Sequence, residues 1–130
     1  MGRQLVAALK AGFPQLTVLA VGTNAAATTA MVKAGADSAA TGENPVIVAC
    51  RKADIIMGPI GIVIADSLMG EVTPAMAAAV GQSNAKRILI PVNHCDNIVV
   101  GVPELTMSKL TDQAMIQVEK LLQSGNSKEQ

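Results

Sequence analysis

Short apolar runs alternate with amphipathic segments along most of the chain. Three of the runs are apolar at most positions, at residues 16–21, 54–57 and 87–92. Continuous apolar runs of this length are typical of strands that helices cover on both faces, as in parallel sheets. Each run ends in glycine or small polar residues. We therefore expect an α/β fold with a mainly parallel sheet.

Helices are predicted where apolar residues recur at helical spacing and where end signals flank them. Asn24, Asn44 and Thr73 are expected N-caps, and proline follows the last two directly. Thr106 or Ser108 is expected to cap the last helix. On these grounds we predict helices at residues 3–11, 25–33, 45–52, 75–82 and 109–123.

Four segments carry weaker patterns. Residues 37–41 favour a short strand, and residues 60–68 favour one or two helical turns. Residues 97–102 form a further apolar run, whereas residues 124–130 are polar and are expected to be disordered. No domain boundary is evident, so residues 1–123 are expected to form a single domain.

Charge and hydropathy exclude two classes of partner. The 10 basic and 10 acidic residues balance, and no basic face is evident for a nucleic acid. The longest apolar stretch, residues 55–65, is about half of the ~20 residues that a membrane span needs. The amphipathic start does not resemble a signal peptide, and two cysteines fit reduced thiols. We expect a cytoplasmic protein.

Several stretches resemble an uncharacterised bacterial family, domain of unknown function family 3842. The resemblance covers residues 2–122 and is most specific between residues 58 and 91. It implies a three-layer, Rossmann-like domain. Members usually begin with a strand and a glycine-rich loop directly ahead of the positions that match residues 2–5, so the resemblance implies that this first strand is missing here. The matching stretches are residues 22–24, 34–37, 40–44, 58–61, 65–77 and 88–91.

The carboxyl ends of parallel strands share one edge of a sheet, where such folds bind ligands. We expect a small-molecule ligand there: a nucleotide, a dinucleotide such as NAD(P), or another phosphorylated compound. If the protein is an enzyme, hydride transfer with NAD(P) is the first reaction class to test. The candidate ligand-binding residues are Gly2, Arg3, Gly22, Thr23, Asn24, Gly42, Glu43, Asn44, Gly58, Pro59, Gly61 and Asn93.

Each candidate also has a purely structural interpretation. Gly2 and Arg3 fit a pyrophosphate at a helix start, or a solvated helix end. Thr23 and Asn24 are neutral where dinucleotide-binding folds carry an acid. They fit a ribose or a 2′-phosphate, or Asn24 is only a cap. Glu43 fits a sugar hydroxyl, or interacts favourably with the helix dipole.

The segment from Gly58 to Gly61 is the strongest local signal, because two glycines let backbone approach a ligand closely. Asp66 and Glu71 follow it and are weak catalytic candidates, as an acid/base pair or as Mg²⁺ ligands. The alternative is a structural turn or an oligomer contact. His94 and Cys95 resemble a nucleophile pair, but adjacent residues rarely share a site, and no metal is expected.

A second function class stays open. Alanine-rich segments at residues 25–30 and 75–79 allow close helix packing, either within the domain or between copies. A sheet without its central strand exposes strand edges, which favours homo-oligomers. The alternative to ligand binding is therefore a regulatory or assembly module.

Overall fold

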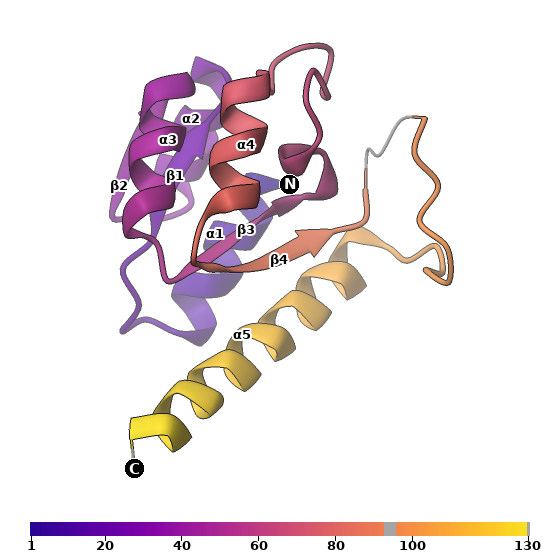
Figure 1. Ribbon diagram of the computed structural model, residues 1–130. Coiled ribbons are helices and arrows are strands. Elements are labelled where there is room, and N and C mark those ends of the chain that lie inside the picture. Colours follow the sequence, from indigo (N-terminus) through magenta and orange to yellow (C-terminus); the bar gives the residue numbers. More distant parts are fainter. Residues whose placement is uncertain (93–95, 130) are drawn as a thin grey trace.

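A computed structural model describes residues 1–92 and 96–129 (Figure 1), and it describes side chains as far as residue 125. Short strands lie in one layer with helices on both sides. The elements are α1 (Gly2–Gly12), β1 (Leu19–Gly22), α2 (Ala25–Lys33), β2 (Ser38–Thr41), α3 (Glu43–Lys52), β3 (Ile55–Pro59), the 3₁₀ turn η1 (Ile60–Val63), α4 (Pro74–Gln82), β4 (Lys86–Ile90) and α5 (Met107–Glu129).

In the described part of the chain, four strands form two parallel pairs rather than the single sheet that was predicted. β1 pairs with β2, with Leu19 opposite Ser38, and β3 pairs with β4, with Ile55 opposite Lys86. Figure 1 shows β2, β1, β3 and β4 in this order across the layer. The α/β class and the parallel direction are confirmed. The inner edges of β1 and β3 are not hydrogen-bonded to each other.

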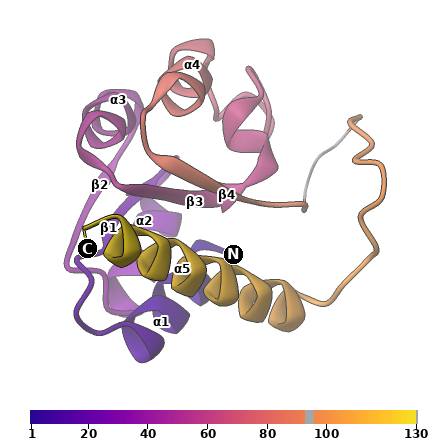
Figure 2. The same ribbon diagram turned by 60° about the horizontal axis from the view of Figure 1, so that its bottom comes forward.

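The helices divide between the two faces of the strand layer. Figure 2 shows α1, α2 and α5 on one side, and α3 and α4 on the other. Contacts between helices agree, because α1 packs on both α2 and α5, whereas α3 packs on α4. This division is expected when each helix crosses from one parallel strand to the next.

Three apolar clusters bury the inner faces of the helices. The first joins α1 and α5 to β4, and the second joins α1 and α2 to β1. The third lies on the α4 side. Their buried members are, in turn, Leu5, Ile90, Leu110 and Ala114; Val6, Val18, Ala20 and Met31; and Val72, Met76 and Ala77.

Local end signals predicted α2 and α4 correctly. The Asn24 carboxamide oxygen accepts a 2.8 Å hydrogen bond from the Ala27 N–H, and the Thr73 hydroxyl accepts one of 3.1 Å from the Met76 N–H. At α3 the prediction was wrong, since the helix begins at Glu43 and Asn44 lies inside it. Gly42 is the N-cap, because its φ of 110° turns the chain from β2 directly into α3.

The strand β1 begins at Leu19, three residues later than predicted, because the Asp37 side chain accepts a hydrogen bond from the backbone just before it. The Asp37 carboxylate accepts a 2.7 Å hydrogen bond from the Val18 N–H. Asp37 also forms a 3.0 Å ion pair with Lys10 of α1. The residue therefore ties β1 to α1 at the point where the chain enters the strand.

The apolar run at residues 97–102 forms no regular helix or strand, whereas the last helix is longer than predicted. Helix α5 begins at Met107, with the Thr106 hydroxyl accepting from the Lys109 N–H at 3.2 Å, and it continues through residues 124–129. No helix in the described ranges is long and apolar enough to cross a membrane.

Candidate functional site

Glu71 connects the carboxyl end of β1 to the loop ahead of α4. Its carboxylate accepts a 2.6 Å hydrogen bond from the Thr23 hydroxyl, and the Asn24 side-chain N–H group lies 3.3 Å from its other oxygen. Glu71 and Asn24 are exposed, and Thr23 is half-buried. Three of the residues that the sequence singled out thus meet in one polar cluster at the predicted edge.

The loop from residue 64 to residue 72 presents Glu71 by folding back on itself. Asp66, Leu68 and Met69 have φ angles of 63°, 53° and 57°, which side chains rarely adopt. The Asp66 N–H donates a 2.7 Å hydrogen bond to the Val72 carbonyl oxygen, and Val72 is buried. These contacts fix the loop immediately beside Glu71.

Gly22 has a specific packing role at the same edge. A Cβ atom on Gly22 would lie 2.8 Å from the Thr28 backbone nitrogen, so α2 approaches β1 too closely for any side chain. The Gly42 N–H donates a 3.1 Å hydrogen bond to the Gly22 carbonyl oxygen. The ends of β1 and β2 are thereby held together beneath the polar cluster.

The glycines at positions 58 and 61 are accounted for by their own loop. A Cβ on Gly58 would lie 3.1 Å from Ile62, and one on Gly61 would lie 3.1 Å from the Ser67 hydroxyl. The Ser67 hydroxyl donates to the Gly61 carbonyl oxygen. Pro59 ends β3 and is the N-cap of η1. The space at these glycines is therefore filled by the chain itself.

The start of α1 packs against α2. A Cβ on Gly2 would lie 2.6 Å from the sulfur of Met31, so glycine permits this close contact. Arg3 is exposed and, with Lys33, lines a shallow groove of about 790 Å³ between the two helices. This groove contains no residue from the ends of the strands.

The other candidates do not join the cluster. Glu43 and Asn44 are exposed in the first turn of α3, and Asp66 is exposed in the loop before Glu71. Asn93, with His94 and Cys95, lies outside the described residues. Within the described ranges, no group of three or more His, Cys, Asp or Glu side chains is placed to hold a metal ion.

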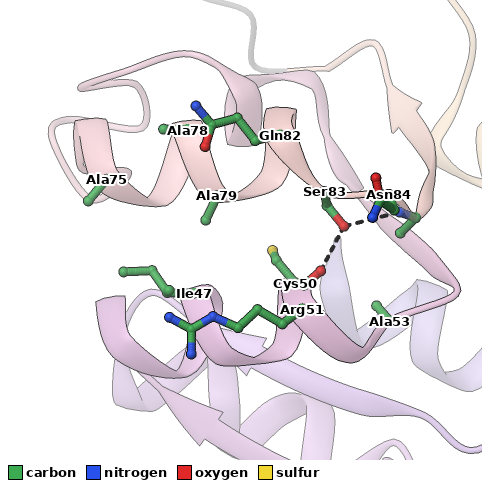
Figure 3. A pocket seen from close by; sticks show the side chains of 11 residues that line it. Ile47, Cys50, Arg51, Ala53, Ala75, Ala78, Ala79, Gln82, Ser83 and Asn84 are labelled. Carbon is green, nitrogen blue, oxygen red and sulfur yellow. Dashed lines mark hydrogen bonds between the residues drawn. The ribbon is translucent and has the colours of Figure 1, made fainter.

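Sequence reasoning did not identify a second groove, of about 500 Å³, between α3 and α4 (Figure 3). Small side chains of α4 form one wall, and Cys50 of α3 is buried, with burial raising the pKa of its thiol. The Ser83 hydroxyl donates a 2.7 Å hydrogen bond to the Cys50 carbonyl oxygen. The alanine-rich pattern at residues 75–79 was the only sequence signal for this groove.

Comparison with known families identifies the chain at family level. A family model described as Domain of unknown function (DUF3842) matches residues 1–123. The chain belongs to this family. No curated protein and no solved structure matches it. The predicted family is confirmed, whereas the Rossmann-like description and the missing first strand stay predictions.

Proposed function

We propose that the protein binds a ribose-containing nucleotide or dinucleotide at the carboxyl edge of its strands, with Glu71 accepting hydrogen bonds from ribose hydroxyls. The supporting observation is the position of the Glu71 carboxylate, 2.6 Å from the Thr23 hydroxyl. Dinucleotide-binding folds carry an acid beyond the end of the corresponding strand, where it holds the ribose. Here the acid comes from a loop 48 residues further along the chain than Thr23.

The charge of the cluster favours one kind of ligand. A carboxylate accepts hydrogen bonds from a vicinal diol, but it repels a phosphate placed at the same point. Thr23 and Asn24 already donate to Glu71, so they hold its oxygens in place for additional donors. We therefore expect a free 2′-hydroxyl to be preferred over a 2′-phosphate.

The phosphate group of the same ligand would bind at a different place on the protein. The start of α1 has no side-chain cap, and Arg3 lies in its first turn. Free backbone N–H groups and the positive end of the helix dipole favour an anion there.

A small phosphorylated ligand and reduced cysteines also fit a bacterial cytoplasm, which we propose as the location of the protein.

Isothermal titration calorimetry with NAD, NADP, AMP and inorganic phosphate tests this function. Calorimetry suits a chain without Trp or Tyr. NAD is expected to bind more tightly than NADP. Glu71→Gln is expected to weaken NAD binding about tenfold, or ~1.4 kcal/mol.

Glu119→Gln is the matched control, because Glu119 is an exposed glutamate on α5. This variant is expected to bind like the wild type. Absence of binding heat for all three nucleotides would contradict the proposal. Equal affinity of Glu71→Gln and wild type for NAD would show that Glu71 is not part of the binding site.

A further inference from the structure

We propose that residues 98–102 form an arm that pairs with the free edges of β1 and β3 in a second copy of this chain. Residues 96–106, drawn in orange, project from the body in both views (Figures 1 and 2). Ile98 is 88% exposed, Val100 91% and Val102 42%. Neighbouring aliphatic side chains left exposed in this way mark an interaction surface.

The same chain carries edges that match this arm. Among the described residues, β1 is hydrogen-bonded only to β2, and β3 only to β4, so each has an edge without a strand partner there. Leu19, in β1, is 48% exposed. Unpaired edges expose backbone N–H and C=O groups that a further strand can satisfy. Figure 1 draws β1 and β3 as neighbours in the strand layer, and we therefore place the inserted strand between them.

The composition of the arm fits an interior position in the sheet. Ile98, Val99, Val100 and Val102 are apolar, and only Gly101 interrupts the run. A strand at an outer edge would alternate apolar and polar residues, whereas one covered on both faces is apolar throughout. The arm has five residues, as β3 has. Helices flank β1 and β3 on both sides, so an inserted strand would be covered.

Charge disfavours the antiparallel pairing of two arms about their central residue. An antiparallel pair centred on Val100 would place Asp96 of one copy opposite Glu104 of the other, and like charges opposite each other destabilise a strand pair. Exchange of arms between two copies avoids this contact. If the two copies are related by a two-fold axis, both pairs of edges are filled and the assembly closes as a dimer.

Sedimentation velocity over a wide range of concentration tests the proposal, with a matched pair of substitutions. Ile98 and Ile116 are both exposed, at 88% and 52%. The wild type and Ile116→Lys are expected to dimerise, and Ile98→Lys is expected to be a monomer. Because Ile98 makes little contact within its own copy, the variant should fold normally, which circular dichroism checks.

Cysteine cross-linking identifies the surface that the arm contacts. Val100→Cys and Leu19→Cys are made separately in a Cys50→Ala, Cys95→Ala background and then mixed under mild oxidation. We place Val100 of one copy opposite Leu19 of the other, and a disulfide between the two variants is then expected, because directly opposite residues of paired strands lie within bonding distance. A monomeric wild type, a dimeric Ile98→Lys variant, or disulfides of Val100→Cys with itself would each overturn the proposal.

Discussion

The Thr23 hydroxyl donates a 2.6 Å hydrogen bond to the Glu71 carboxylate, and this contact joins the end of β1 to the loop ahead of α4. The two residues are far apart in sequence. Their contact places a carboxylate at the edge where the sequence had suggested a neutral site. It also makes the loop from residue 64 to residue 72 part of the candidate site.

A double-mutant cycle measures this contact. Thr23→Val and Glu71→Gln together are expected to destabilise the fold less than the sum of the single changes, with a coupling of about 0.5–1 kcal/mol. The cycle is measured by calorimetric unfolding. Thr29→Val replaces Thr23→Val in the control cycle, because Thr29 donates to the Ala25 carbonyl oxygen and not to Glu71. A coupling of equal size in the control would mean that the Thr23–Glu71 contact is not the cause.

Gly22→Ala is expected to destabilise the fold by about 1–3 kcal/mol, because the added methyl group would overlap the start of α2. The nearest backbone atom, the Thr28 nitrogen, lies 2.8 Å from the Cβ position. Gly81 is the matched control within α4, because no atom lies within 4 Å of its Cβ position. Gly81→Ala is expected to stabilise the fold by about 0.5–1 kcal/mol. Thermal unfolding of the two variants gives opposite signs if the packing at Gly22 is as described.

The stability of the fold is expected to fall in acid partly through Asp37. The hydrogen bond from the Val18 N–H, with the one from Lys10, lowers the pKa of Asp37. A lowered folded-state pKa contributes stability above the unfolded-state pKa, and this stability is lost as the pH falls through the folded-state pKa. The Tm of Asp37→Asn should therefore decline less steeply than that of wild type below about pH 5.

Lys10→Met separates the two causes of this shift. It removes the ammonium group but leaves the Val18 N–H in place, and that backbone hydrogen bond is the larger cause. Most of the wild-type pH dependence should therefore remain in Lys10→Met. A slope as flat as that of Asp37→Asn would show instead that the ion pair with Lys10 is the main cause.

Cys50 is expected to react slowly with thiol reagents while the protein is folded. It is 9% exposed, and burial raises the pKa of its thiol, so less of the reactive thiolate is present at neutral pH. Labelling of Cys95→Ala, in which Cys50 is the single cysteine, should be at least about tenfold slower in buffer than in urea. Equal rates in the two solvents would show that the α3–α4 packing opens readily.

Local signals predicted the helices well because they act over a few neighbouring residues. Asn24 and Thr73 are caps whose side chains reach N–H groups three residues on, and both helices begin where they indicate. The prediction failed at Asn44. There the φ angle of Gly42 starts the helix earlier, and a polar side chain followed by proline does not reveal such an angle.

The sequence by itself determined the α/β class, the parallel strands, the family and the edge where polar residues gather. These features follow from apolar periodicity, local caps and matching motifs. Only the tertiary structure decided that the strands form two pairs, that the glycines at 58 and 61 accommodate their own loop, and that Glu71 meets Thr23. Strand pairing and side-chain contacts join segments that are distant in the chain, and their energies depend on packing that one-dimensional patterns do not contain.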